Sequence, residues 1–170
     1  GIGTSVRYKN WNASLLIEGK NGGQIMSGSN GEMLGRGLHK MTVPAGGRES
    51  GFVPDGVMED GSAISASLNT AQQQNYWNKY NDAAEASIYD ADYMRLRNLS
   101  IGYSLPSSML EGSSIQSATI SLIGKNLFFL SNSVDNIDPE SAYNSNNSQG
   151  LEYWGMPVPR TVGVNVNLKF

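Results

Sequence analysis

Hydrophobic and polar residues alternate strictly along residues 160–170 of the chain. The apolar positions in this segment are Val162, Val164, Val166, Leu168 and Phe170. The positions between them are polar or glycine, and a period of two places the two sets on opposite faces of a β-strand. Such a strand suits a setting with lipid on one face and a water-filled lumen on the other. A half-buried strand in a soluble antiparallel sandwich has the same pattern, with its valines in a core.

Further strand-like patterns occur upstream, and they are less regular. Together with the last segment, the predicted strands are at about 4–19, 89–105, 115–130 and 160–170. In the second of these, the apolar residues change parity between Leu96 and Leu99, and a β-bulge near Asn98 would restore their common face. In the first, Val6 and Trp11 also differ in parity. We predict a single strand there.

The connections between the predicted strands alternate in length. The turn between the second and third strands is short, whereas residues 20–87 and 131–158 form long connections. Transmembrane β-barrels combine brief periplasmic turns with extended outer loops, and compact soluble domains seldom contain such long irregular connections. A periplasmic C-terminus would place both long loops outside the cell. The predicted fold class is therefore all-β: an antiparallel transmembrane β-barrel segment with long extracellular loops, occupying the whole of 1–170.

The second half of the first long loop contains a helical pattern. Thr70 can act as the N-cap of a short helix, and Tyr76, Trp77 and Tyr80 then lie on one face of it. These aromatic side chains either fix the loop to neighbouring segments or stack on sugar rings. The pattern alone leaves both interpretations open.

Composition excludes several classes of partner and chemistry. The formal net charge is −3 and no basic cluster is present, so nucleic acid is not an expected partner. The absence of cysteine excludes disulfides and thiolate metal sites. No run approaches the roughly 18 apolar residues that a transmembrane helix needs, and the first residues lack the basic and apolar regions of a signal peptide.

No catalytic or metal-binding constellation stands out in the sequence. The single histidine, His39, lies in a Gly-rich segment, and the chain has no nucleophile-elbow motif. We therefore predict that the protein is not an enzyme and uses no cofactor. Asp135, Asp138 and Glu140 could offer oxygen ligands to calcium, but they lack the EF-hand spacing. Turn formation is the simpler explanation of this segment, so no metal site is predicted.

Several separate motifs follow one another in the second half of the chain. They are YMRLRNLSIGYSLP at 93–106, IQSA at 115–118, GKNLF at 124–128, NIDPE at 136–140 and PRT at 159–161, followed by the run to Phe170. In order and spacing they resemble the closing, C-terminal segment of SusC/RagA outer-membrane proteins. The resemblance covers about 89–170, and RYKNW at 7–11 is also similar. Residues 22–69 carry no such motif.

This resemblance implies both a fold and a function. It implies a barrel of about 22 strands, of which the chain would hold roughly the last four, closed by an N-terminal plug that lies outside this sequence. It places the protein in the outer membrane of a Gram-negative bacterium, in contact with lipid. The implied function is TonB-dependent import of large nutrients, either glycans or oligopeptides, with a SusD-like surface lipoprotein. TonB would act through the missing N-terminal region.

Local roles follow from this placement. The candidates for contact with substrate or lipoprotein are the aromatic residues of the two outer loops, because aromatic faces suit both sugar stacking and protein interfaces. These residues are Tyr76, Trp77, Tyr80, Tyr143, Tyr153 and Trp154. The terminal aromatic residue, Phe170, resembles the signal that the barrel-assembly machinery reads.

Two alternatives remain at this stage. The first is a TonB-dependent receptor for a siderophore or cobalamin, which would act without a lipoprotein. The second is a secreted β-sandwich that binds carbohydrate. The sandwich predicts that the valines of 160–170 form a water-excluded core, whereas a barrel predicts that they face lipid.

Overall fold

The computed structural model describes residues 1–141, 143 and 146–170. The described residues divide into two compact units. The first unit comprises residues 1–23, 90–140 and 156–170, and the second comprises 24–89 and 141–155. Within this part of the chain, no helix is long and apolar enough to cross a membrane.

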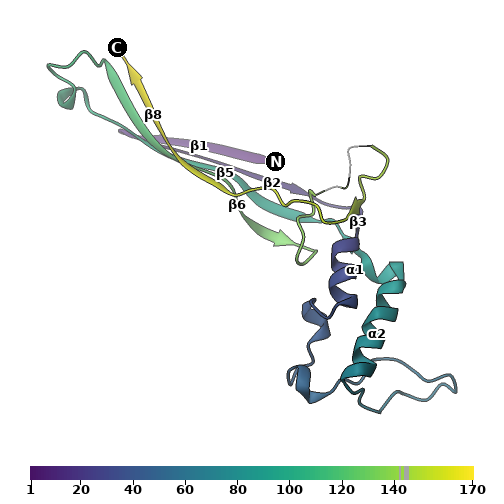
Figure 1. Ribbon diagram of the computed structural model, residues 1–170. Helices are drawn as coiled ribbons and strands as arrows, with labels where there is room; N and C mark the ends of the chain where they lie inside the picture. Colours follow the sequence, from purple (N-terminus) through teal and green to yellow (C-terminus); the bar gives the residue numbers. More distant parts are fainter. Residues whose placement is uncertain (142, 144–145) are drawn as a thin grey trace. The chain divides into compact units, whose positions relative to one another are not determined.

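The first unit is built on one antiparallel sheet (Figure 1). Its strands are β1 (Ile2–Tyr8), β2 (Trp11–Lys20), β5 (Tyr93–Ser104), β6 (Ser117–Asn132) and β8 (Thr161–Lys169). Among the described residues the sheet has five strands in the order β1-β2-β5-β6-β8, and each neighbouring pair is antiparallel. It is an open sheet whose edges are β1 and β8, so the prediction of a mostly β, antiparallel fold is confirmed at that level.

The register gives this sheet one apolar face and one polar face. One row of directly opposed residues consists of Val6, Ala13, Ile101, Leu122 and Val164. The adjacent row consists of Arg7, Asn12, Gly102, Ser121 and Asn165. Because successive side chains of a strand point to opposite faces, the alternation seen in single strands extends across the whole sheet.

The apolar face is exposed. Val164 is 68% exposed and Leu122 is 54% exposed. Monomeric soluble proteins rarely leave so large a contiguous apolar surface uncovered. The prediction of a water-excluded core around the valines of 160–170, which belongs to the β-sandwich alternative, is wrong for this chain.

The predicted single strand at 4–19 is also wrong, because the segment is a β-hairpin. β1 ends at Tyr8 and β2 begins at Trp11, with Tyr8 opposite Trp11 and Val6 opposite Ala13. Lys9 has a φ of 53°, a left-handed conformation that tight turns use. The turn explains why Val6 and Trp11 differ in parity yet share a face. The described sheet therefore holds five strands where four were predicted.

Shifts in register keep the apolar side chains of β5 on one face of the sheet and its polar side chains on the other, along the whole strand. The pairing of β5 with β6 shifts between Leu96 and Asn98, where the sequence predicts a bulge, and the pairing of β2 with β5 shifts between Leu16 and Ile17. Beyond these shifts, Leu96 lies opposite Ile17 and Arg95 lies opposite Glu18. The aliphatic residues therefore stay on one face and the charged residues on the other.

The short connections leave the strands at one end of the sheet, and the long connections leave them at the opposite end. Asn10, in the β1–β2 turn, bonds to Ser104 at the end of β5, with 2.8 Å between Asn10 Nδ2 and the Ser104 carbonyl oxygen. The turn therefore lies beside the short β5–β6 connection, which contains the 3₁₀ turn η4 (Ser107–Met109). The long segments 21–92 and 133–160 begin and end at the opposite end of the strands, where Tyr93 pairs with Lys20 and Asn132.

The second unit contains helices and a small sheet where the sequence predicts mainly irregular loop. Its elements are β3 (Gln24–Ser27), α1 (Gly28–Gly35), η1 (Lys40–Thr42), η2 (Arg48–Ser50), α2 (Thr70–Asp82), η3 (Ala84–Ser87), β4 (Ile88–Asp90) and β7 (Leu151–Glu152). The small sheet has the order β4-β3-β7, in which β3 and β7 are parallel. Positions 142 and 144–145 of the predicted loop 131–158 lie outside the described residues.

The predicted helix is present as α2, but its cap differs. Thr70 is the first helical residue, and Asn69 is the N-cap. The Asn69 side chain accepts a hydrogen bond from the Gln72 amide at 3.0 Å, and the Gln72 side chain accepts one from the Asn69 amide at 2.9 Å. This reciprocal capping box satisfies two backbone donors at the start of the helix, which is why Asn69 rather than Thr70 occupies the cap.

Candidate functional site

The polar face of the large sheet carries hydroxyl and amide groups around a hollow of about 680 Å³. The polar residues that line it are Ser5, Arg7, Asn12, Ser14, Ser104, Thr119, Ser121, Asn165 and Asn167. The Ser104 and Thr119 hydroxyls are 3.1 Å apart and hydrogen-bonded. The hydroxyl and amide groups bind water or neutral polar ligands, and Arg7 adds one positive charge. They provide neither a nucleophile with a base nor a cluster of metal ligands.

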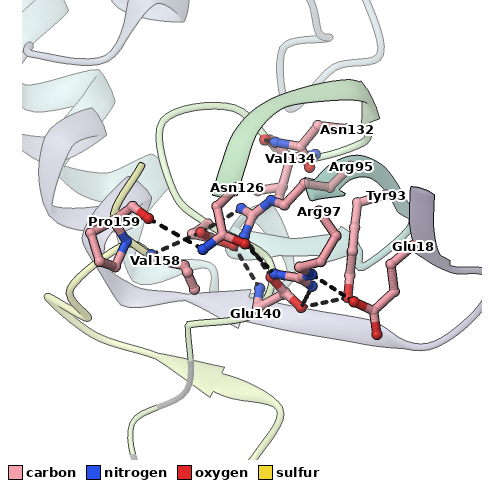
Figure 2. A network of polar contacts seen from close by, with 11 residues as sticks. Glu18, Tyr93, Arg95, Arg97, Asn126, Asn132, Val134, Glu140, Val158 and Pro159 are labelled. Atoms are coloured by element: carbon pink, nitrogen blue, oxygen red, sulfur yellow. Dashed lines mark hydrogen bonds and ion pairs between the residues drawn. The ribbon is translucent and has the colours of Figure 1, made fainter. Parts of the chain in front are cut away.

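A buried arginine lies at the end of this polar face, near the long connections (Figure 2). Arg95 of β5 is 3% exposed and donates to Asp138 Oδ2 and Glu140 Oε2, at 2.6 Å each. Its guanidinium also stacks on Phe129, 3.9 Å from the ring centroid. Buried charges are stable only when they are paired and hydrogen-bonded, and Arg95 meets both conditions.

A second arginine, Arg97, extends the network toward β2 and β6 (Figure 2). It donates to Glu18 Oε2 at 2.6 Å, to Asn126 Oδ1 at 2.8 Å and to Glu140 Oε1 at 2.5 Å. The Tyr93 hydroxyl donates to the same Glu140 oxygen at 2.7 Å. Glu140 is therefore bound by side chains at three alternate positions of β5, which the strand period places on one face.

The environment of Glu140 holds its carboxyl in the charged form. Burial alone would raise the pKa of this carboxyl, but hydrogen bonds from Arg97 and Tyr93 and the charges of Arg97 and Arg95 outweigh it, and the pKa is lowered. Asp138 accepts in addition from the amides of Glu140 and Val158, both at 3.0 Å. The network therefore fastens the segment after β6, and the approach to β8, to the polar face of β5.

These contacts contradict the calcium alternative. The carboxylates of Asp138 and Glu140 are occupied by two guanidinium groups, whose positive charges would repel a cation. In the part of the chain that the structure describes, no group of three or more His, Asp or Glu side chains is arranged to hold a metal ion.

In the second unit, α1 and α2 pack closely because glycines of α1 face asparagines of α2. A Cβ atom built on Gly35 would lie 3.2 Å from Asn78 Oδ1. One built on Gly31 would be in severe contact with Asn81 Oδ1 and 2.9 Å from Ser87 Oγ. Small residues four positions apart occupy one helix face, so Gly31 and Gly35 set the distance between the two helices.

The aromatic residues of α2 form a cluster with Phe52. The ring centroids of Trp77 and Phe52 are 5.4 Å apart, and those of Trp77 and Tyr80 are also 5.4 Å apart. Tyr76 lies 5.4 Å from Phe52. Trp77 is 6% exposed, whereas Tyr76 and Tyr80 are partly exposed. This packing favours the interpretation that these residues fix the loop, above all for Trp77.

The aromatic residues near β7 are more accessible. Tyr153 is 45% exposed, Trp154 is 61% exposed, and their ring centroids lie 6.2 Å apart. Tyr143 is 60% exposed and its amide donates to the Leu151 carbonyl at 2.8 Å. The structure thus brings Tyr153 and Trp154 together, and keeps them separate in sequence and packing from the Trp77 cluster.

A buried carboxylate holds this exposed pair in place. Glu152 is 1% exposed and accepts from Ser27 Oγ and Ser29 Oγ, at 2.7 Å each, and from the Gly155 amide at 3.0 Å. Ser29 Oγ also accepts from the Trp154 amide at 2.7 Å. Trp154 has a φ of 54°, so this bonding fixes a backbone conformation that non-glycine residues rarely adopt.

Sequence reasoning did not identify Arg95, Arg97 or Glu152 as important residues. The spacing of the arginines and the motif NIDPE were visible, but their pairing joins segments more than 40 positions apart, Asp138 being 43 positions after Arg95. Phe170, the predicted assembly residue, follows β8 and is 72% exposed. Its neighbour Lys169 pairs with Ser117, the first residue of β6. Phe170 therefore lies at the end of the sheet from which the short connections leave.

Comparison with known proteins gives similarities along the whole chain. No family model matches. The chain is 27% identical over 189 aligned residues to TonB-dependent receptor P3 of Formosa agariphila, an alignment that covers 100% of this chain and 16% of the relative. The chain therefore spans about 16% of the length of this relative.

Solved structures share the fold. The RagAB peptide transporter matches with a TM-score of 0.61 and 14% identity, and the RagAB peptide importer in its open-open state with a TM-score of 0.62 and 18% identity. Each match covers 99% of this chain and 16% of the solved chain. The relative from Formosa agariphila is a receptor, and the solved structures are of a transporter. These similarities confirm the resemblance of this chain to a C-terminal segment of a SusC/RagA-like transporter.

Proposed function

We propose that this chain forms the closing part of a TonB-dependent importer of the SusC/RagA kind in the outer membrane of a Gram-negative bacterium. The observation that carries the proposal is the sheet with one exposed apolar face and one polar face in register across β1, β2, β5, β6 and β8. Lipid covers the apolar face, and the polar face lines the interior of the barrel.

The open edges of the sheet support a larger barrel. β1 and β8 are edge strands, and edge strands leave backbone donors and acceptors unpaired, which is not tolerated in the hydrocarbon region. Further strands of the full protein pair with both edges. In a barrel of about 22 strands, the plug and the remaining wall come from parts of the protein outside this chain.

The connectivity supports an extracellular location for the long segments 21–92 and 133–160. With a periplasmic C-terminus, β8 runs toward the periplasm. The β1–β2 and β5–β6 turns then lie on the periplasmic side, because they are at the same end of the strands as Phe170. The segments that contain α1, α2 and β7 then lie outside the cell. The transported nutrients are glycans or oligopeptides, captured with a SusD-like lipoprotein, and TonB supplies energy through the N-terminal region.

Among the aromatic candidates, the Tyr153–Trp154 pair best fits contact with the lipoprotein or the substrate. It is exposed and held rigidly by Glu152, and rigid aromatic anchors contribute strongly to interfaces. Trp154→Ala should weaken lipoprotein binding or nutrient uptake by about thirtyfold, the factor that corresponds to an anchor of about 2 kcal/mol. Met58→Ala, at another exposed apolar residue of the same unit, is the control. Equal binding and uptake in both variants would remove Trp154 from the interface.

The test of the function itself is isolation of the full-length protein from native outer membranes in mild detergent, followed by mass spectrometry of what remains bound. The proposal predicts a SusD-like lipoprotein near one-to-one stoichiometry, and nutrient uptake that stops when the inner-membrane proton gradient is collapsed. A complex without such a lipoprotein, or uptake that persists without the gradient, would contradict it.

A further inference from the structure

Three aromatic side chains lie side by side on the apolar face of the large sheet. In this aromatic row, Tyr8 is opposite Trp11 and Trp11 is opposite Tyr103. Each lies two positions along its strand from a residue of the apolar row that begins with Val6, so the strand period places it on the same face. Tyr8 is 67% exposed and Trp11 is 54% exposed. The aromatic row is therefore presented to the surroundings rather than packed in a core.

The aromatic row is the last row of this face before the short turns. Tyr8 and Trp11 flank the turn formed by Lys9 and Asn10, and Tyr103 is the last residue but one of β5. The next two rows toward the centre of the sheet contain no aromatic residue among the described positions. Rings that carry a polar group therefore occur at the end of the apolar face, and the rows inside them are mainly aliphatic.

The polar atoms of the aromatic row are available to a partner. The hydroxyls of Tyr8 and Tyr103 and the indole N–H of Trp11 form no hydrogen bond with the residues that the structure describes. Lys9 has its Nζ 5.4 Å from the centroid of the Tyr8 ring, and it forms no ion pair with a described residue. Tyr, Trp and Lys side chains of this kind collect at membrane interfaces, where the apolar part stays in hydrocarbon and the polar part reaches the headgroups.

The C-terminal residue continues this boundary across the sheet. Val166 of β8 belongs to the row of Tyr103, and Phe170 follows it four positions later with the same parity. Four residues span about 13 Å and the four strand spacings from β1 to β8 span about 19 Å, so a line from Tyr8 to Phe170 is inclined by about 35° to the row. Strands of membrane barrels are tilted by about 35–45°. The line from Tyr8 to Phe170 therefore has the inclination expected of the membrane surface.

We propose that the aromatic row and Lys9 bind the headgroup of a phospholipid in the periplasmic leaflet, at the level where the hydrocarbon region ends. Lys9 binds the phosphate, and the indole N–H and the tyrosine hydroxyls donate to phosphate and ester oxygens. The inference rests on the proposed function, because it takes the apolar face to be covered by lipid. A phospholipid fits both parts of this surface, since it offers acyl chains to the aliphatic rows and an anionic group to Lys9.

The first test measures lipid binding by native mass spectrometry of the full-length protein in detergent. The probes are dioleoylphosphatidylglycerol and dioleoylglycerol, which share their acyl chains and differ in the phosphate-containing headgroup. Lys9→Gln should weaken binding of the phospholipid by about fivefold, the effect of one basic residue near anionic lipid, and should leave dioleoylglycerol binding unchanged. Trp11→Leu, which stays apolar but loses the N–H, should also weaken phospholipid binding. Lys169→Gln is the matched control, because it removes an exposed charge at the same end of the sheet from the opposite face.

The second test locates the headgroups in vesicles of phosphatidylcholine that contain the full-length protein. A bimane fluorophore is attached to Tyr8→Cys, Phe170→Cys or Val166→Cys, and its quenching is measured with a nitroxide on the lipid headgroup or in the middle of the acyl chain. The ratio of headgroup to chain quenching should be alike at Tyr8→Cys and Phe170→Cys. It should be severalfold lower at Val166→Cys, which shares the row of Tyr8 but lies on the hydrocarbon side of the inclined line.

Unchanged phospholipid binding in Lys9→Gln, or an equal loss in Lys169→Gln, would overturn the lipid site. A quenching ratio at Val166→Cys as high as that at Tyr8→Cys would overturn the inclined boundary. A label at Val166→Cys that neither nitroxide quenches would contradict the lipid-covered face, and with it the proposed function. Strong chain quenching at Val166→Cys together with unchanged phospholipid binding in Lys9→Gln would contradict this inference alone.

Discussion

Arg95 connects the sheet to the segment that follows β6. Its side chain is 3% exposed and holds Asp138, which is 4% exposed, and Glu140 at 2.6 Å each. Removing one partner of a buried pair leaves the other charge without compensation, which costs about 3–5 kcal/mol. By contrast, the pair between Arg97 and the 46% exposed Glu18 contributes about 1 kcal/mol or less.

Arg95→Met should therefore loosen residues 133–141, because it keeps the apolar stem and removes the charge that Asp138 needs. Hydrogen exchange measured by mass spectrometry on the full-length protein should show protection of this segment falling by roughly the factor that 3 kcal/mol implies. Arg160→Met, at an exposed arginine, is the control and should leave the segment unchanged. Unaltered protection in Arg95→Met would mean that the segment is held by other contacts.

The lowered pKa of Glu140 gives a dependence on pH with a defined sign. A carboxyl with a folded-state pKa below its unfolded value contributes stability above the unfolded pKa and loses it as the pH falls through the folded pKa. The unfolded value is near 4.5. The thermal midpoint of the wild type should exceed that of Glu140→Gln by a constant amount at neutral pH, and the difference should shrink only below about pH 4.5. A difference that disappears between pH 7 and 6 would contradict this assignment.

The sequence was informative about single residues only where a local pattern determines their role. The alternation around Val164 indicated which side chains share a face, and the structure has them on one face. The roles of Arg95 and Glu152 were not predictable, because their partners come from distant segments and nothing local distinguishes a buried charge from an exposed one. Asp138 and Glu140 were read as possible calcium ligands for the same reason.

At the scale of elements, the β1–β2 hairpin and the α1–α2 pair show where patterns fail. The hairpin turn consists of Lys9 and Asn10, and it lacks the glycine that usually marks such turns. The change of parity between Val6 and Trp11 was therefore not interpreted as a reversal of the chain. The helix α1 contains Gly28, Gly31 and Gly35. Glycines lower helix propensity, and the sequence therefore predicted loop where packing stabilises a helix.

The close approach of α1 and α2 leads to a prediction about Gly31. Alanine should favour the helix by about 1 kcal/mol through propensity, but the added methyl group would overlap Asn81 Oδ1, and overpacking typically costs about 1–3 kcal/mol. Gly31→Ala should therefore reduce hydrogen-exchange protection of both helices. Asn75→Ala changes an exposed position of α2 and should preserve or raise protection. If Gly31→Ala also raised it, the helices would not be packed through this glycine.

At the scale of the whole molecule, the two faces of the sheet and the two kinds of connection support one account. An exposed apolar face costs free energy in water, about 25 cal/mol for each Å², and this cost disappears in lipid. The same arrangement places the helices α1 and α2 and the Tyr153–Trp154 pair on segments that leave the strands at one end of the sheet. The open edges at β1 and β8 explain why the chain needs the rest of the barrel.

The most direct test of this account is spin labelling of Val164 and Asn165, neighbours on opposite faces of β8, in the full-length protein in native outer membranes. Each position is changed to cysteine and labelled, and the accessibility of the label to oxygen and to a water-soluble nickel complex is measured. The account predicts high oxygen accessibility at Val164 and high nickel accessibility at Asn165, because lipid concentrates oxygen and excludes the complex. A label at Val164 that neither reagent reaches, or that the nickel complex reaches freely, would contradict a lipid-facing surface.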